Sequence, residues 1–368
     1  MTVYLMAGGG TAGHVNPLLA VSDALRRAEP DAEIIVLGTA EGLEARLVPA
    51  RGYELVTIAK LPFPRRPDAA ALRFPARFRS SMATVRRLIE SRKVDAVVGF
   101  GGYASAPAYS AAHREGIPLV LHEANAKPGM ANKLGARYTR FVGVAFENTA
   151  ISHARFVGMP LRREIEDLDR AAARPDALAY FGLEDRPTLL VTGGSLGARR
   201  INATVTSSAE ALVGAGYQVL HIQGGSAEFS DPGVDGYHLI DYCDRMDFAL
   251  AVADAAISRA GAATVSELSA LGIPAFYVPY AVGNGEQRFN AAGVVSAGGA
   301  VLIDDADFTP ERLRDSVLPI LADPAALAHM AEAAAAVGVR DGAERMLSLI
   351  AEARVRDTQP GRTDRSGR

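Results

Sequence analysis

Short apolar, β-branched runs alternate with amphipathic helical stretches along this chain, a pattern typical of a parallel α/β architecture. In the first half, strands are expected at residues 3–7, 33–37, 54–58, 96–100, 118–122, 141–145 and 154–157, with helices over 17–28 and 79–91. The second half restarts the pattern, with strands expected at 188–192, 218–223, 252–258 and 274–279 and a helix over 198–215. The alternation therefore predicts two Rossmann-like halves.

The length also favours two domains, because 368 residues exceed what one hydrophobic core usually organises. We expect an N-terminal Rossmann-like domain over residues 1–160 and a C-terminal one over 161–340. A helix over 341–356 is expected to pack back on the N-terminal domain. The polar residues 357–368 are expected to form a disordered tail.

Composition and charge exclude several classes of protein. The net charge of −3 argues against nucleic-acid binding by bulk electrostatics. The single cysteine, Cys243, excludes an intramolecular disulfide framework and is most simply a small buried apolar side chain. The first residues lack the basic region of a signal peptide, and the apolar run over 96–112 is too short and broken to cross a bilayer. We therefore expect a cytosolic protein whose membrane contact is peripheral.

Three of the expected strands end in a glycine-rich turn. In the first turn, Gly8, Gly10 and Gly13 satisfy the G-x-G-x-x-G pattern between a strand and a helix. A dinucleotide site also needs an acid at the end of the second strand, whereas the first acid here, Glu41, lies beyond a further turn. Hydride transfer is therefore disfavoured, and a purely structural turn is the other alternative.

The second turn runs from Gly193 to Ala198 and the third from Ser258 to Glu267. Each precedes a helix, whose first N–H groups favour a phosphate. Glu267 would lie one to two turns into its helix, where a carboxylate can accept two hydrogen bonds from a ribose diol. The plainer alternative is an acid favoured near a helix N-terminus. Together the turns predict a nucleoside diphosphate ligand held between two domains.

Seven motifs, in this order, resemble those of the MurG family. They are Gly9-Gly10-Thr11-Ala12-Gly13-His14-Val15, Gly101-Gly102-Tyr103, His122-Glu123-Ala124-Asn125, Gly158-Met159-Pro160-Leu161-Arg162, Gly193-Gly194-Ser195-Leu196-Gly197-Ala198, Arg259 to Glu267, and Glu286-Gln287-Arg288-Phe289-Asn290-Ala291. The resemblance implies the GT-B fold. It also implies transfer of N-acetylglucosamine from UDP-GlcNAc to the C4 hydroxyl of MurNAc in undecaprenyl-pyrophosphoryl-MurNAc-pentapeptide, with inversion at the anomeric carbon.

Sugar transfer needs a base for the acceptor hydroxyl, and His14 is the candidate because the start of a helix keeps an imidazole neutral. His122 is expected to be structural. The resemblance implies donor contacts by Thr11, Ala12, Gly13, Asn125, Arg162, Ser195, Cys243, Ala262, Ala263, Thr264, Val265, Ser266, Glu267 and Gln287, with Tyr103 and Glu123 on the acceptor side.

The sequence departs from the family pattern at three positions. Ala12 stands where the family usually has glycine, Leu196 where many members have glutamine, and Glu286 where some have a further glutamine. Alanine at position 12 is sterically mild. Because Glu286 would repel a pyrophosphate, the donor contact is assigned to Gln287.

No metal or cofactor is expected. Arg162, Ser195 and the helix N-termini after the second and third turns can supply positive potential for the departing diphosphate. No Asp-x-Asp pair occurs beside a predicted nucleotide strand, and Asp304-Asp305-Ala306-Asp307 is interpreted as a surface turn.

Residues 60–93 combine cations with apolar side chains. The arginines are Arg65, Arg66, Arg73, Arg77, Arg79, Arg86, Arg87 and Arg92, and within the segment only Asp68 and Glu90 oppose them. Such a segment suits an anionic membrane surface, at the cytoplasmic face of the cell membrane. A solvated helix face over an ordinary core is the alternative.

Other functions remain compatible with the residues alone. They are a GT-B transferase acting on a different lipid or a small molecule, a UDP-GlcNAc epimerase, and a non-catalytic sugar-nucleotide-binding subunit. Turnover of UDP-GlcNAc by the purified chain, with and without a lipid acceptor, distinguishes among them.

Overall fold

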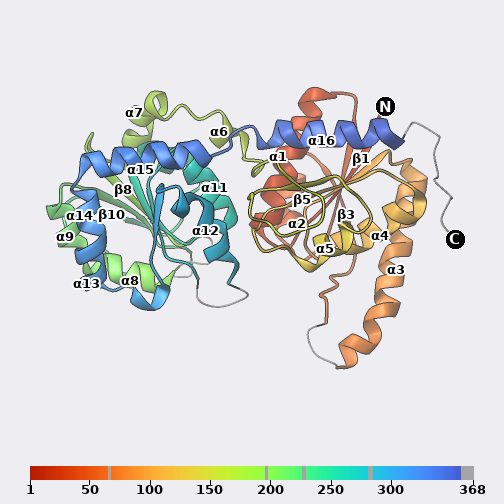
Figure 1. The fold of residues 1–368 in the computed structure, drawn as a ribbon, viewed down its shortest axis with the longest axis horizontal. Coiled ribbons are helices and arrows are strands. Elements are labelled where there is room, and N and C mark those ends of the chain that lie inside the picture. Colours follow the sequence, from red (N-terminus) through yellow and green to blue (C-terminus); the bar gives the residue numbers. More distant parts are fainter. Residues whose placement is uncertain (65–67, 195–197, 226–228, 281–284, 358–368) are drawn as a thin grey trace. The chain divides into compact units, whose positions relative to one another are not determined.

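The computed structural model describes residues 1–64, 68–194, 198–225, 229–280 and 285–357. The chain divides into two compact units. The first contains Met1–Ala124, Pro128–Pro160 and the chain from Asp341 onward, and the second contains Asn125–Lys127 and Leu161–Arg340. Each unit is an α/β structure with one parallel sheet (Figure 1).

The first unit is built on a seven-stranded sheet in the order β3-β2-β1-β4-β5-β6-β7. Its strands are β1 (Val3–Ala7), β2 (Glu33–Gly38), β3 (Glu54–Thr57), β4 (Ala96–Gly99), β5 (Leu119–Glu123), β6 (Val142–Val144) and β7 (Ala154–Phe156). Its helices are α1 (Ala12–Ala28), α2 (Glu44–Ala50), α3 (Ala69–Arg92), α4 (Ser105–Glu115), α5 (Met130–Gly135) and α16 (Gly342–Asp357). All the strand pairs are parallel, and Leu5 of β1 lies opposite both Ile35 and Val97.

The central strand β1 is buried on both faces, as its continuous apolar sequence requires. Because strand residues alternate between faces, Leu5 joins the core that contains Val85 of α3 and Tyr109 of α4. Its neighbours Tyr4 and Met6 join the opposite core, which α1 and α16 cover. The last described helix of the chain therefore packs against the first.

The second unit has a six-stranded parallel sheet in the order β10-β9-β8-β11-β12-β13. Its strands are β8 (Thr188–Thr192), β9 (Gln218–Ile222), β10 (Tyr237–Ile240), β11 (Ala255–Ser258), β12 (Ala275–Tyr277) and β13 (Ala300–Leu302). Its helices are α6 (Arg163–Glu166), α7 (Arg170–Phe181), α8 (Arg199–Ser207), α9 (Ala209–Gly214), α10 (Met246–Val252), α11 (Ala262–Ala270), α12 (Glu286–Ser296), α13 (Pro310–Arg312), α14 (Leu318–Leu321) and α15 (Pro324–Val337), with a 3₁₀ turn at Asp305–Asp307 and a π-helical turn at Leu313–Val317.

Several expected boundaries are wrong. Helix α1 begins at Ala12, not at 17, because Pro17 is accommodated inside the helix. Helix α3 begins at Ala69, not at 79, where the Asp68 carboxylate accepts the N–H of Ala71 as an N-cap. The single helix expected over 198–215 breaks at Ser208 into α8 and α9. Val252 ends helix α10 and residues 253–254 connect it to β11, so the strand expected from 252 begins at Ala255. Strands β10 and β13 were not predicted.

No single helix in the described ranges is both long and apolar enough to cross a bilayer. The pair Pro310–Leu321 and Pro324–Val355, bent by 86°, meets the same criteria only when taken together.

Candidate active site

His14 lies just beyond the carboxyl end of β1, the edge of a parallel sheet where ligands usually bind. It is the third residue of α1, and its Nδ1 lies 3.2 Å from the carbonyl oxygen of Gly9 and 3.4 Å from Oγ1 of Thr11. A carbonyl oxygen can only accept, so Nδ1 carries the proton in this contact. The lone pair of the neutral ring then lies on Nε2. Thr11 is exposed, and Ala12, Gly13 and His14 are half-buried.

A buried carboxylate that the sequence did not indicate lies beneath the same turn. Glu44, the first residue of α2, accepts the N–H of Gly10 at 2.7 Å and both the N–H and the hydroxyl of Thr39 at 2.9 and 2.8 Å. Burial alone would raise the pKa of Glu44, but these hydrogen bonds hold the pKa below its ordinary value. The Gly10 N–H is therefore engaged by a protein anion.

The turn after β4 packs directly on the first turn. Gly101 and Gly102 have φ of +86° and +90°, and a Cβ on Gly102 would overlap the Gly9 backbone. A Cβ on Gly101 would lie 3.2 Å from Nε2 of His14, so this turn forms one wall beside the imidazole. Tyr103 lies next to Gly10, and its ring lies 5.0 Å from Nζ of Lys60. The predicted acceptor-side Tyr103 and the predicted base thus share one region.

The residues at the end of β5 are held within the first unit. Glu123 is buried, and its Oε2 accepts from Gly129 N at 2.9 Å and from Nδ2 of Asn132 at 2.8 Å, which fixes the start of α5. His122 is also buried and donates from Nε2 to the Gly158 carbonyl at 3.0 Å. Burial, and to a smaller extent the neighbouring His14, lowers the pKa of His122 to about 4. His122 is therefore neutral near pH 7.

In the second unit, two predicted donor contacts pair with each other. Nη2 of Arg162 lies 3.5 Å from Oε1 of Glu267. Burial raises the pKa of Glu267, and Arg162 opposes that rise. The Cys243 thiol is buried, which raises its pKa to about 11, and Arg162 acts on it in the opposite direction. Arg162, Cys243 and Glu267 thus lie in one region of this unit.

Helix α11 starts at Ala262, within the third glycine-rich segment, with Gly261 as its N-cap. Ala262 and Val265 are buried against the core, whereas Ala263, Thr264 and Ser266 are partly exposed. Only the partly exposed residues and the backbone N–H groups of this helix start are therefore placed to meet a ligand. Glu267 follows on the next turn of the helix.

Helix α12 fixes two loops of the second unit. Oε1 of Gln287 accepts the N–H of Tyr280 at 2.8 Å. Asn290, which belongs to the seventh motif but was given no role there, accepts from Ala126 N at 2.9 Å and donates to the Ala260 carbonyl at 3.3 Å. Its Nδ2 also lies 3.5 Å from Oδ1 of the predicted donor contact Asn125. Asn290 thereby joins residues 125–127 to the turn before α11.

Two further expectations concern the carboxyl edge of this sheet. Ser195 and Leu196 lie outside the described residues. Residues 305–307 form a 3₁₀ turn with no buried residue, in agreement with the expected surface turn, but Asp305 also has a structural role. It is partly buried and accepts from Nη1 of Arg259 at 2.5 Å and from Nε of Arg200 at 3.1 Å, joining the loop after β11 to α8.

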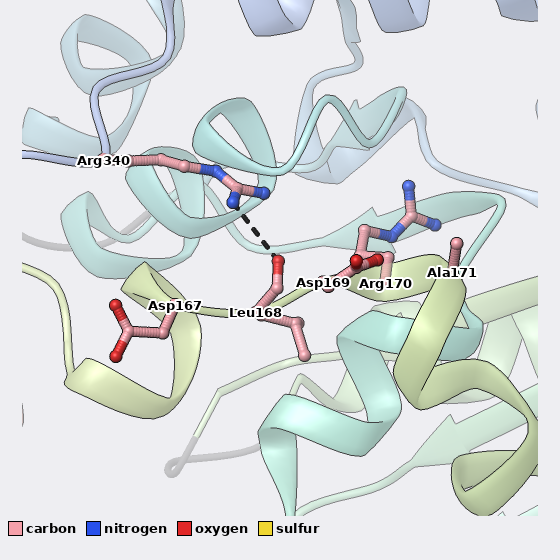
Figure 2. Close-up of a pocket in the computed structure, with 6 residues that line it drawn as sticks. All are labelled: Asp167, Leu168, Asp169, Arg170, Ala171 and Arg340. Atoms are coloured by element: carbon pink, nitrogen blue, oxygen red, sulfur yellow. Dashed lines mark hydrogen bonds between the residues drawn. The ribbon is translucent and has the colours of Figure 1, made fainter.

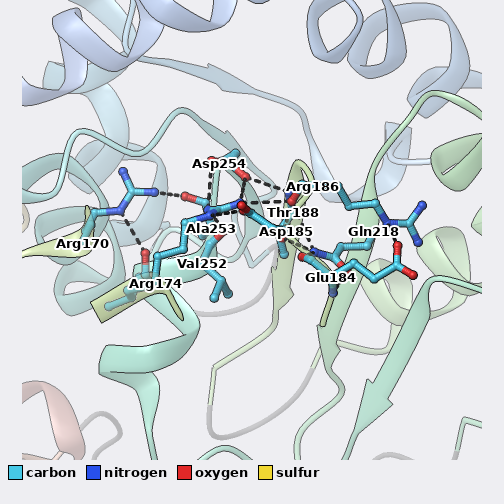
Figure 3. Close-up of polar contacts among 11 residues, drawn as sticks. Arg170, Arg174, Glu184, Asp185, Arg186, Thr188, Gln218, Val252, Ala253 and Asp254 are labelled. Carbon is cyan, nitrogen blue, oxygen red and sulfur yellow. Dashed lines mark hydrogen bonds and ion pairs between the residues drawn. The ribbon is translucent and has the colours of Figure 1, made fainter. Parts of the chain in front are cut away.

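Two pockets in the second unit lie elsewhere, at or near the amino ends of its strands. One, of about 710 Å³, is lined by Arg174, Pro187, Tyr217 and Asp254 among others, and a smaller one lies beside Arg170 and Arg340. The arginines are engaged structurally: Arg174 bonds Asp254 and the Val252 carbonyl, and Arg340 bonds the Leu168 carbonyl (Figures 2 and 3). Because the predicted ligand groups follow the carboxyl ends, neither pocket is the candidate site.

The basic segment divides into a paired and an unpaired part. Arg86 pairs with Glu115, and Arg92 pairs with Glu33 and Glu54, all from outside the segment. Within the described residues, Arg73, Arg77 and Arg79 are exposed and pair with no acid, and Leu72 is 86% exposed. Arg65 and Arg66 lie outside the described residues. In Figure 1 this amino-terminal half of α3, in orange, extends beyond the rest of the first unit.

Among the described residues, no group of three or more His, Cys, Asp or Glu side chains could hold a metal ion.

Residues 4–144 match the glycosyltransferase family 28 N-terminal domain, and residues 188–346 match the glycosyltransferase family 28 C-terminal domain. A protein of Leifsonia xyli is 69% identical over 95% of this chain and 98% of its own length. It is described as UDP-N-acetylglucosamine–N-acetylmuramyl-(pentapeptide) pyrophosphoryl-undecaprenol N-acetylglucosamine transferase. A Streptomyces coelicolor protein of the same description is 52% identical over 95% of this chain and 97% of its own.

The chain belongs to the MurG family. The crystal structure of Acinetobacter baumannii MurG is similar, with a TM-score of 0.79 and 27% identity over 96% of this chain and 100% of that one. The calicheamicin glycosyltransferase CalG4 shares the fold alone, with a TM-score of 0.68 and 19% identity over 98% of this chain and 100% of that one. The expected GT-B fold is thereby confirmed.

Within each unit, the structure gathers part of the residues that the sequence selected. The first turn and its neighbours bring together Thr11, Gly13, His14 and Tyr103. Glu123 is instead buried, and its carboxylate is hydrogen-bonded to the start of α5. Arg162, Cys243 and Glu267 form a second group. The sequence did not indicate Glu44, although Gly9, Gly38 and Gly42 leave room for its carboxylate. Asn290 was part of a motif, but its role in joining two loops was not predicted.

Proposed function

We propose that this chain transfers N-acetylglucosamine from UDP-GlcNAc to the C4 hydroxyl of MurNAc in undecaprenyl-pyrophosphoryl-MurNAc-pentapeptide. The observation that carries the proposal is 69% identity, over nearly the whole of both chains, to a protein described as that transferase. The product would be the disaccharide-linked lipid of peptidoglycan synthesis, formed with inversion at the anomeric carbon.

We infer that His14 is the base of this reaction. Its Nδ1 proton is directed at the Gly9 carbonyl, so Nε2 is the atom that accepts the proton of the acceptor hydroxyl. Tyr103 lies beside the same turn and supports an acceptor-side role for this region. Glu123 then contributes by fixing the loop before α5.

We infer that the second unit holds the donor. Glu267 receives the ribose diol, and Arg162, which opposes the rise that burial causes in the pKa of this carboxyl, supplies positive potential for the diphosphate. The other donor contacts proposed for this unit are Asn125, Ser195, Cys243, Ala262, Ala263, Thr264, Val265, Ser266 and Gln287, whereas the donor contacts expected of Thr11, Ala12 and Gly13 would come from the first unit. The half-buried backbone at the start of α11 supports this assignment.

We also propose that the protein acts as a peripheral protein at the cytoplasmic face of the cell membrane. Arg73, Arg77 and Arg79 are exposed and face no acid in the described part of the chain, although Arg77 donates to the Lys60 carbonyl. These cations and the exposed side chain of Leu72 support contact with an anionic lipid surface.

A transfer assay with the purified chain tests the function. Radiolabel from UDP-GlcNAc should appear in the lipid-linked acceptor and should not be transferred when the acceptor is omitted. Epimerised sugar nucleotide without transfer would instead indicate an epimerase, and binding of UDP-GlcNAc without any turnover would indicate a non-catalytic subunit. EDTA should leave the rate unchanged, because no metal is assigned a role; a loss that Mg²⁺ reverses would contradict this part.

A further inference from the structure

Glu44 and His14 bind opposite ends of one peptide group. Oε2 of Glu44 accepts the N–H of Gly10 at 2.7 Å, and Nδ1 of His14 donates to the carbonyl oxygen of Gly9, 3.2 Å away. The Gly9 carbonyl and the Gly10 N–H belong to the same peptide unit. Because the peptide is trans, its carbonyl and N–H point in opposite directions, so the carboxylate and the imidazole lie on opposite sides of it.

The position of the Glu44 carboxylate is built from several segments of the first unit. A Cβ on Gly9, Gly38 or Gly42 would overlap the Glu44 side chain, so three glycines make room for it. Thr39 fixes its second oxygen with two hydrogen bonds. Glu44 is fully buried, and the Gly10 N–H that it holds belongs to a residue with a φ of +93°. A residue so enclosed is suited to hold one peptide in one orientation.

We propose that Glu44 is a positioning residue for His14, acting through the Gly9–Gly10 peptide. This inference rests on the proposed base role of His14. A negative charge at the N–H end polarises the peptide and makes its carbonyl a stronger acceptor, as in other chains of hydrogen bonds. That stronger acceptor holds the proton on Nδ1 and orients the ring. In hydrolases with a catalytic triad, a carboxylate bound directly to histidine has this role.

The reaction step is consistent with this arrangement. Nε2 of His14 takes the proton as the acceptor O–H bond breaks, and the hydroxyl oxygen forms a bond to the anomeric carbon. The glycosidic C–O bond to UDP breaks, and UDP leaves with the electron pair. The imidazolium that forms then has both nitrogens protonated, and its Nδ1–H remains bonded to the polarised Gly9 carbonyl. His122 is neutral and does not compete for the proton.

The ring nitrogens of His14 provide a test that does not depend on activity. Long-range ¹H–¹⁵N spectra of the full-length chain report the tautomer of each of its seven histidines. A spectrum of His14→Gln identifies the His14 signals by their loss. In the wild type above pH 8, His14 should be mainly the Nδ1–H tautomer. A wild-type spectrum dominated by the Nε2–H tautomer would overturn the proposal without any Glu44 variant.

Glu44→Gln removes the charge and retains the side-chain shape. We expect a mixture of His14 tautomers, a kcat about tenfold lower, and an acid limb of the pH profile displaced to lower pH, because the imidazolium loses a stabilising charge. The KM for UDP-GlcNAc should change little. Unchanged tautomer and pH profile in the folded variant would show that Glu44 only supports the turn.

Glu29→Gln is the matched control. Glu29 accepts from Tyr4 Oη at 2.7 Å and from Arg354. It lies just beyond the opposite end of α1, roughly 22 Å from His14 at 1.5 Å per residue. It should lose stability without any change in His14 tautomer or pH profile. If the wild type transfers no sugar while Glu44→Gln still alters the tautomer, the proposed function fails and the link between Glu44 and His14 stands.

Discussion

A histidine acts as a base only when one ring nitrogen keeps its lone pair, so the contact of the other nitrogen decides what the residue can do. Here Nδ1 faces the Gly9 carbonyl, and Nε2 lies near the position that a Cβ on Gly101 would occupy. If His14 is the base, as proposed, we expect the acceptor hydroxyl to approach Nε2 beside the wall formed by Gly101 and Gly102.

His14→Ala should lower kcat by about 10²–10⁴-fold, because the acceptor hydroxyl loses its base. The Kd for UDP-GlcNAc, measured by calorimetry, should change little. His113→Ala is a suitable control, since His113 stacks on Tyr138 in the same unit with ring centroids 4.4 Å apart, and its kcat should equal that of the wild type. Near-normal turnover of His14→Ala would remove His14 from the mechanism.

Glu267→Ala should raise the KM for UDP-GlcNAc by about tenfold or more with a smaller change in kcat, because a ribose contact is lost in ground and transition states alike. Glu164→Ala is the control, since Glu164 also lies near Arg162, at 3.9 Å, but is more exposed. If the two variants have the same KM, Glu267 has only a structural role at the start of α11.

For individual residues, the sequence could predict that His14 follows a glycine-rich turn at the start of a helix. It could not predict the tautomer, because that depends on where one peptide points, which the backbone at Gly10 decides. Glu44 was missed for a related reason. It lies in a short helix with no repeating pattern, and only the packing of Gly9, Gly38 and Gly42 around its carboxylate distinguishes it from a surface acid.

Among the secondary-structure elements, α3 shows how an exposed charge pattern can mislead. All its arginines look alike in the sequence, but Arg86 and Arg92, near its carboxyl end, are paired with acids from β2, β3 and α4. The candidate membrane surface is therefore centred on the amino-terminal half, where the rings of Phe74 and Phe78 lie 5.8 Å apart.

Arg73→Glu/Arg77→Glu should weaken binding to anionic vesicles by about tenfold or more, since each cation contributes roughly 1 kcal/mol near the headgroups. Transfer to a long-chain lipid acceptor should slow, while transfer to a short water-soluble acceptor should remain near normal. Sedimentation with vesicles of defined anionic content measures the first effect.

The matched control is Arg312→Glu/Arg314→Glu, two exposed arginines of the second unit, with the same change in net charge. It should sediment like the wild type. Equal sedimentation of all three proteins would mean that the α3 cations are only a solvated face.

The elements that sequence could predict were those with continuous apolar runs. Strands β1 and β8 have the expected bounds, because five consecutive buried residues leave a clear pattern. The three-residue strand β13 and the partly exposed β10 carry no comparable signal, since tertiary pairing with a neighbouring strand creates them. Helix starts were misplaced for a similar reason, since capping by Asp68 depends on the loop before it.

For the molecule as a whole, the first unit depends on both ends of the chain. Helix α16 places Met346 and Ile350 in the core that Tyr4 and Val15 also form. At its far end, Arg354 bonds Glu29 and Tyr4. The amino-terminal sheet is therefore covered on one face by residues that follow the entire second unit in sequence.

Ile350→Ala should lower the free energy of unfolding of the first unit by about 2–5 kcal/mol, because Ile350 is 1% exposed and its removal leaves a cavity. Urea denaturation followed by circular dichroism measures the change. Val355→Ala on the same helix, 61% exposed, should change it by less than about 0.5 kcal/mol. Equal effects would mean that α16 adds little to this core.

The route of α16 also affects synthesis on the ribosome. After Pro160 has emerged, the nascent first half has its strands but not the helix that covers Tyr4 and Met6. At 5–20 residues per second, roughly 10–40 s pass before α16 is made. During that interval the apolar face of the sheet that α16 will cover is open to chaperones or to other nascent chains. Stalling of translation within the second unit should therefore favour aggregation of the first unit, although its residues up to Pro160 have already been made.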